Sequence, residues 1–180
     1  APLRDLSTRS VIGRAVEEMH QSYRWSAADI EWEVFGQAAD GAATVVRLKD
    51  SVSIDAIRGA LRTLKYKQDG LVWSSTAETP ITGELSATLA SIAIIPGKRL
   101  LVAGDRDTYV QTVLRVIDRH EPSLLSVRPA SEVAAALTGA DTALLSSGPV
   151  ACRAPTLEKV SADVQTQAAK ADCRAGDLAV

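Results

Sequence analysis

The chain has 180 residues, 46% hydrophobic and 23% charged, a balance that argues against wholesale disorder and suffices for one domain of ordinary size. Its net charge of −2, with acids and bases mixed along the chain, disfavours nucleic-acid binding, which needs a basic face. No stretch approaches the ~20 apolar residues of a membrane span. Aromatic residues are only 4%, so we expect the three tryptophans, Trp25, Trp32 and Trp73, to anchor the core.

Hydrophobic periodicity predicts the elements of the first eighty residues. Apolar residues every three or four positions indicate helices, and alternating apolar and polar residues indicate half-exposed strands. The expected elements are a helix at 7–23, strands at 25–35 and 43–48, a helix at 51–64, and a hairpin at 66–73 that turns at Asp69-Gly70. Gly59 lies inside the second helix, where glycine is costly, so we expect close packing of that helix on the sheet.

In the first strand, alternation places Glu31 and Glu33 on one face. The apolar residues on the opposite face are Ile30, Trp32 and Val34. Two carboxylates on one face can form an acid–base couple. Nothing around them indicates burial, however, so a solvated sheet face is the simpler interpretation.

The strongest local pattern is a hairpin followed at once by a helix, over residues 90–120. Apolar strands at 92–95 and 100–102 flank a turn at 96–98, and Gly104 and Asp105 end the second strand. The helix that follows carries one apolar stripe, formed by Val110, Val113, Leu114 and Ile117. We expect this stripe to lie on the hairpin.

The order strand–turn–strand–helix occurs at 30–64 and again at 91–118, as a repeat of pattern more than of identity. We therefore predict an α+β fold. Its antiparallel sheet is built from two pseudo-repeated ββα-type halves, about 26–78 and 79–150, with helices packed mainly on one face. All 180 residues are expected to form a single domain.

Three further elements are predicted after Glu121-Pro122. They are a short helix at 131–137 closed by Gly139, a strand at 141–146, and a helical segment at 155–175.

The two cysteines, Cys152 and Cys173, leave two alternatives open. In a cytosolic protein they would be free thiols, since the chain has no CxxC and no His cluster typical of zinc. In an exported domain they would form a disulfide closing a loop of about 20 residues, worth on the order of 3 kcal/mol. We favour the disulfide, because the chain opens without Met and uses little Lys and Met. A disulfide holds its Cα atoms within ~7 Å, so it limits the C-terminal helix to about three turns.

No motif in the sequence is typical of a catalytic, metal or cofactor site. His20 and His120 lack a metal-ligand partner at i+2 to i+4, and no nucleophile elbow, dinucleotide-binding or phosphate-loop motif is present. Gly97-Lys98 fits a hairpin turn better than a phosphate loop, and Ser146-Ser147 precedes Gly and Pro in ordinary turn chemistry. We therefore predict no catalytic residue, no metal and no cofactor.

The cysteine-bearing stretches ACRAP and ADCRAGD, the Ala/Val/Asp-rich composition and the repeated strand–helix pattern resemble extracytoplasmic domains of actinobacterial cell-envelope proteins. Many of these are membrane-anchored or lipidated, and some are accessory factors for export of mycolic glycolipids such as trehalose monomycolate. The resemblance implies an extracytoplasmic location, an N-terminal membrane anchor missing from this chain, and an envelope or membrane protein as partner. It assigns no functional residue.

Three functions are weighed. The leading hypothesis is a non-catalytic envelope domain that binds another protein, as an accessory factor of a lipid-export assembly; a filled core with an exposed apolar patch would favour it. A carrier or sensor for a small apolar ligand or lipid needs a wide cavity. The small residues compatible with such a cavity are Ala60, Ala134, Ala135 and Ala136. An enzyme needs a cleft with titratable groups such as carboxylates and His120.

Overall fold

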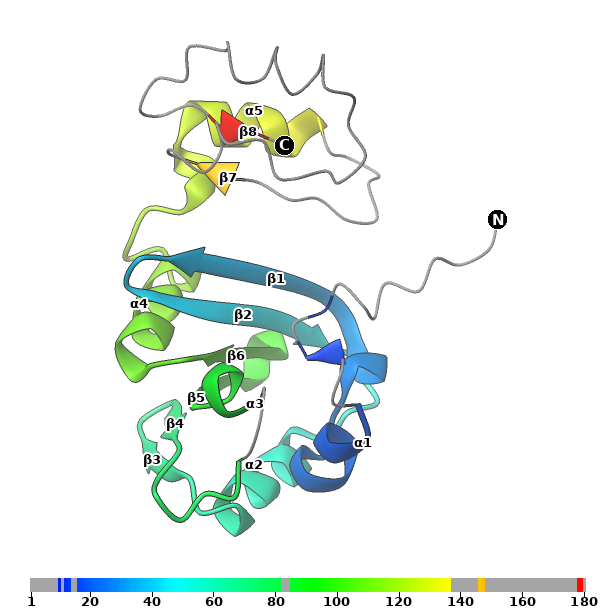
Figure 1. The fold of residues 1–180 in the computed structure, drawn as a ribbon. Helices are drawn as coiled ribbons and strands as arrows, with labels where there is room; N and C mark the ends of the chain where they lie inside the picture. The colour runs from blue at the N-terminus through cyan, green and yellow to red at the C-terminus, as the bar shows by residue number, and fades with distance from the viewer. Residues whose placement is uncertain are drawn as a thin grey trace, which may run out of the picture. The chain divides into compact units, whose positions relative to one another are not determined.

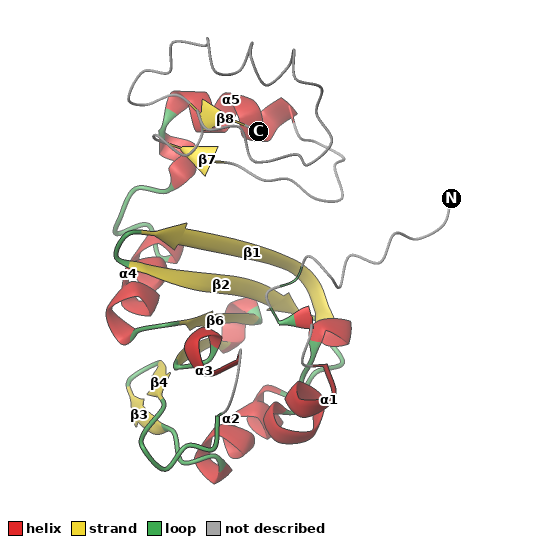
Figure 2. Ribbon diagram, in the orientation of Figure 1, coloured by secondary structure: helices red, strands yellow, loops and turns green. Residues whose placement is uncertain are grey.

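The computed structural model describes residues 10, 12–13, 16–81, 85–136, 146–147 and 178–179. These residues form an α+β fold (Figures 1 and 2). By its internal contacts the chain divides into two compact units, 1–121 and 122–180. The division falls at Glu121-Pro122, where we expected a single domain to continue.

The first unit contains the whole of the main sheet. Its helical elements are α1 (Val16–Glu18), the π-helical turn η3 (Met19–Tyr23), the 3-10 turn η4 (Ala27–Asp29), α2 (Ile54–Thr63), α3 (Leu85–Thr88), the 3-10 turn η5 (Pro96–Lys98) and α4 (Asp107–Ile117). Its strands are β1 (Ile30–Ala38), β2 (Gly41–Leu48), β3 (Lys67–Asp69), β4 (Val72–Ser74), β5 (Ser91–Ile95) and β6 (Leu100–Gly104).

The described part of the second unit is short. It consists of the 3-10 turn η6 (Leu124–Ser126), α5 (Arg128–Ala136), and the antiparallel pair β7 (Ser146–Ser147) and β8 (Leu178–Ala179). Helix α5 confirms the helix predicted at 131–137 but begins three residues earlier. The predicted segment 155–175, Gly139 and both cysteines lie outside the described residues. Among those residues, no helix is both long enough and apolar enough to cross a membrane.

Six antiparallel strands form the sheet in the order β1-β2-β6-β5-β4-β3. The hairpin of β5 and β6 is third in the chain, yet it lies between the two earlier hairpins. The predicted hairpin and helix over residues 90–120 are thereby confirmed. The two halves were expected to meet at about 78/79 within one continuous sheet, and β4 pairs with β5 across that position.

Each face of the sheet carries its own core, because successive side chains of a strand point to opposite faces. On one face, called here the α2 face, Val46, Ile92 and Leu101 are buried with residues of η3, α2 and α3. On the other, the α4 face, Ala93 and Val102 pack with α4 through the fully buried Val110 and the rest of its apolar stripe. Helices thus lie mainly on one face, with α4 on the other.

This placement of helices bears on the predicted repeat. Helix α2 follows the β1–β2 hairpin and packs on one face, whereas α4 follows the β5–β6 hairpin and packs on the other. The central strands β2 and β6 are antiparallel neighbours, so only a twofold axis perpendicular to the sheet exchanges them. A rotation about such an axis keeps each face of the sheet on its own side, so a true repeat would place α2 and α4 on the same face. The similarity of pattern is therefore not a repeat of structure in the described residues.

Two glycines show opposite packing. A Cβ on Gly104 would lie 2.8 Å from the Ala42 carbonyl oxygen and 3.0 Å from Cγ2 of Val110, so this position holds β6 close to β2 and α4. Around Gly59 nothing lies within 4 Å of such a Cβ. The close packing expected at Gly59 is wrong, because this part of α2 is not pressed against a neighbouring element.

We predict that alanine at these two glycines changes stability in opposite directions. Gly59→Ala should raise the free energy of unfolding by about 0.5–1 kcal/mol, since alanine favours the helix and meets no neighbour. Gly104→Ala should lower it by about 1–3 kcal/mol, because the backbone it meets cannot move aside. Urea unfolding followed by circular dichroism measures both, and a neutral Gly104→Ala would contradict the close approach described above.

Candidate functional site

The two edges of the sheet differ in length and chemistry. Within the described residues, β1 and β3 each pair with one neighbour only, so each leaves a row of backbone N–H and C=O groups for another strand. Strand β3 has three residues, Lys67, Gln68 and Asp69, all polar and exposed. Strand β1 has nine residues and forms the edge of the sheet opposite β3 (Figure 1). Short, charged edges resist pairing, whereas a long edge with apolar side chains invites it.

The exposed apolar residues of β1 lie on both faces of this edge. Trp32 is 46% exposed, Val34 58% and Phe35 48%. Trp32 and Val34 point to the α4 face, because they pair with Arg47 and the half-buried Val45. Phe35 pairs with Thr44 and points to the α2 face. We call these three side chains the β1 apolar edge.

A β-bulge corrects the predicted faces of β1. The register with β2 shifts between Ile30 and Trp32, which leaves Glu31 as the extra residue. Ile30 therefore packs against the core of the α2 face, while Trp32 and Val34 point to the α4 face. The expectation that all three share one face is wrong. From Trp32 to Ala38 the register is unbroken.

The same shift in register helps to explain why Trp32 is exposed, whereas the other two tryptophans are buried. Trp25 and Trp73 are buried and anchor the core as predicted. Trp32, expected in the core with them, lies on the strand that α4 does not cover, since α4 packs on β2, β4, β5 and β6.

Both carboxylates of β1 have structural partners. Arg47 Nε lies 3.5 Å from Glu31 Oε2, in an ion pair that crosses to β2. The hydroxyl of Thr44 donates a hydrogen bond of 3.1 Å to Glu33 Oε1. These contacts hold β1 on β2 and do not bring the two carboxylates onto a common target. They give no support to an acid–base couple.

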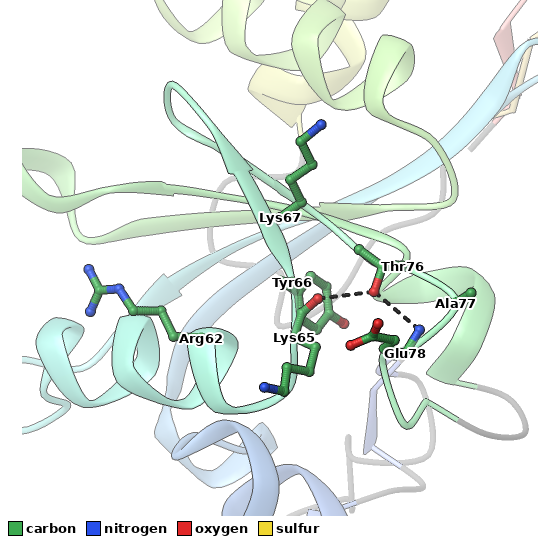
Figure 3. A pocket seen from close by; sticks show the side chains of 7 residues that line it. All are labelled: Arg62, Lys65, Tyr66, Lys67, Thr76, Ala77 and Glu78. Atoms are coloured by element: carbon green, nitrogen blue, oxygen red, sulfur yellow. Dashed lines mark hydrogen bonds between the residues drawn. The ribbon is translucent and has the colours of Figure 1, made fainter.

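A shallow, open depression of about 500 Å³ lies beside the β3 edge (Figure 3). Its lining includes Arg62, Lys65, Lys67 and Glu78. In Figure 3 the three basic side chains point in different directions, so their charges do not converge on one anion. Arg62 lies over the ring of Trp73, 5.5 Å from its centroid, in a cation–π contact. The depression is a solvated surface with a basic rim.

Tyr66 forms the floor of this depression and makes buried hydrogen bonds. Its hydroxyl donates to the Leu89 carbonyl at 2.8 Å and lies 3.1 Å from the hydroxyl of Tyr23. Burial raises the pKa of both phenols, and that of Tyr66 far above its usual range. Tyr66 is therefore a neutral group that ties β3 to α3 and η3, and not a general base.

We predict that Tyr66→Phe lowers the free energy of unfolding by about 1–3 kcal/mol, because the buried Leu89 carbonyl loses its donor. The matched control is Tyr109→Phe, because the Tyr109 hydroxyl makes no hydrogen bond to the described residues. This variant should change the free energy of unfolding by less than about 0.5 kcal/mol. Thermal and urea unfolding at pH 7 compare the two, and equal losses would contradict the role assigned to the Tyr66 hydroxyl.

A second prediction concerns alkaline pH. Above about pH 10 Tyr23 and Tyr66 lose their protons in the unfolded chain, while burial keeps both protonated in the folded chain. The unfolded state then binds fewer protons, so stability is intact below pH 10 and falls as the pH rises. Urea unfolding between pH 8 and 11.5 should show this fall, and Tyr66→Phe should reduce its slope. If Tyr66→Phe leaves the slope of stability against pH unchanged, this would contradict the assignment of the fall to the buried Tyr66.

A small apolar pocket of about 140 Å³ opens next to the β1 apolar edge. It lies between α3 and neighbouring ends of β1, β2 and β6, with Phe35, Ala42, Ala87 and Ala103 among its lining residues. Drug-sized ligands occupy cavities of about 300–1,000 Å³, so this pocket accepts at most a single small side chain or fragment.

The remaining candidate residues do not assemble into a site. His20 and His120 are exposed, and the described residues contain no cluster of three or more His, Cys, Asp or Glu suited to a metal. Lys98, in the turn compared with a phosphate loop, lies 3.2 Å from Asp118 and joins the hairpin to the end of α4. Ser146 and Ser147 form β7. Cys152 and Cys173 lie outside the described residues, so their disulfide stays a prediction.

Comparisons with known proteins add no family to this description. The scan of family models, the search of curated proteins and the search of solved structures each found no match to the chain.

Proposed function

We propose that this chain is a non-catalytic protein-interaction domain of the cell envelope, whose β1 edge accepts a strand from another polypeptide. The β1 apolar edge is the observation that carries this proposal. Added strands bind through main-chain hydrogen bonds, and the side chains beside them supply specificity. Trp32, Val34 and Phe35 offer apolar contacts on both faces of such a strand.

The filled core supports binding at the surface over binding in a cavity. Both faces of the sheet are packed with buried apolar side chains, including Trp25, Leu101 and Val102. The apolar pocket beside Phe35, at about 140 Å³, is too small for a lipid chain. The described part of the chain thus holds no cavity suited to a lipid, and a carrier for a lipid or other apolar ligand is the weaker alternative.

An enzyme is also less well supported. The open depression in Figure 3 has diverging cations and a neutral tyrosine, and the exposed His120 belongs to no group of three or more metal-ligating side chains among the described residues. Catalysis needs groups that converge on one reacting atom.

The envelope location and the role as an accessory factor in lipid export rest on the resemblance of sequence given above. That resemblance supports an envelope or membrane protein as the partner and an anchor outside this chain. An extended segment of such a protein matches the chemistry of the β1 edge.

We predict that the chain can be cross-linked through β1 in the cells that produce it. Benzoylphenylalanine in place of Val34 should yield an adduct with another polypeptide after irradiation, because this side chain is 58% exposed on the edge of β1 that pairs with no other described strand. The control replaces Leu71, which is 48% exposed on the turn beside β3. The adduct from position 34 should be at least several-fold more abundant, and mass spectrometry of the excised band identifies the partner.

Equal adducts from both positions, or none from position 34, would contradict the proposal. Cell fractionation of the same samples reads the location, since recovery of the adduct in the cytosol would contradict an envelope protein. Native mass spectrometry of the protein in gentle detergent tests the alternative, because a bound mass typical of a lipid would favour a carrier.

A further inference from the structure

We propose that the strand added to β1 is β1 of a second copy of this chain, so that two six-stranded sheets join edge to edge. This inference rests on the proposed function and names its partner. Two copies of one strand pair antiparallel about a twofold axis perpendicular to the sheet. Each residue then lies opposite a residue of the same face, so the α4 faces of both copies continue into each other.

The sequence of β1 is self-complementary when this axis passes through Val34. Val34 then faces its own copy, Trp32 faces Gly36, and Glu33 faces Phe35. Glu31, at the bulge, comes opposite Gln37. No carboxylate meets another, which matters because like charges directly opposite each other destabilise a strand pair. An axis one residue earlier would instead place Glu33 against Glu33.

Trp32 and Gly36 supply the specific fit. Nothing lies within 4 Å of the position that a Cβ on Gly36 would occupy, so the strand has an open space there. A glycine in an edge strand packs poorly by itself, and an aromatic side chain on the opposing strand covers it. The pairing forms this contact twice. On the α4 face, Trp32 and Val34 of both copies then make one continuous apolar row.

Charge does not oppose the association. The formal net charge of each copy is only −2, so two copies repel weakly. Natural proteins block edge strands with lysine, proline, inward charges or β-bulges. Strand β1 has no Lys, Arg or Pro from Ile30 to Ala38, and its bulge at Glu31 lies outside the unbroken register from Trp32 to Ala38. The β3 edge, with Lys67 in a strand of three residues, does have such a block.

Sedimentation velocity of the 180-residue chain over a hundredfold range of concentration tests the proposal. The wild-type chain should shift from the monomer mass toward twice that mass. Val34→Lys should lose the dimer at every concentration, because it places two ammonium groups face to face at the axis. Leu71→Lys makes the same change on a residue of similar exposure beside β3, and should dimerise like the wild type.

Mixing variants checks that position 34 meets itself. Val34→Lys and Val34→Glu should each be monomeric alone, and an equimolar mixture should recover the dimer as a heterodimer. Circular dichroism and thermal unfolding of each variant establish that it is folded, as expected for a change at an exposed side chain. A dimer that survives Val34→Lys, or a mixture that stays monomeric, would overturn the pairing.

The failure of this inference differs from the failure of the proposed function. A wild-type chain that stays monomeric throughout, with a cross-link from position 34 to a different polypeptide, overturns the pairing of two copies and leaves the interaction domain standing. A monomeric chain with no cross-link from position 34 overturns both.

Discussion

The pairing of β2 with β6 is the contact on which the rest of the fold depends. It joins the first hairpin to the third, more than fifty residues later in the chain, in an unbroken antiparallel register. At one end Asp105 locks this pairing twice: the Ala42 N–H donates to Asp105 Oδ1 at 3.0 Å, and the Asp105 N–H donates to the Ala42 carbonyl at 3.1 Å. The first of these bonds holds the pKa of the Asp105 carboxyl below its usual range. Gly104 allows the backbones to approach this closely.

The position of β1 follows from that pairing. With β2 bonded to β6 on one side, the other side of β2 is available to β1 alone, and β1 becomes the rim of the sheet. Helix α4 packs on the inner strands of the sheet, so it buries little of β1 on the α4 face. The exposure of Trp32 and Val34 is thus a consequence of strand order and helix position, and not of a polar sequence.

Local pattern predicted much of this fold, and non-local pairing explains what it missed. The hairpin at Ser91–Gly104 and the stripe of α4 around Val110 are readable because their contacts lie close in sequence. The bulge at Glu31 is not, since one extra residue exchanges the faces of a strand without altering its alternation. Nor does a single sequence reveal which face of β1 lacks a helix. Val34 and Phe35 are two apolar residues in succession. Because neighbouring residues of a strand point to opposite faces, this run was the one signal in the sequence that both faces of β1 carry apolar side chains.

The three-residue β3 edge has a further consequence for assembly. A contact in which one patch meets the same patch on another molecule uses that patch up, and such assemblies close. An open filament needs two different binding surfaces on each molecule, so that one surface binds the other surface of the next molecule. With β3 short and lysine-bearing at one rim, the sheet offers a single adhesive rim. If two copies pair through β1 as proposed, edge pairing of this sheet ends at the pair, because the short, lysine-bearing β3 edge disfavours a further strand.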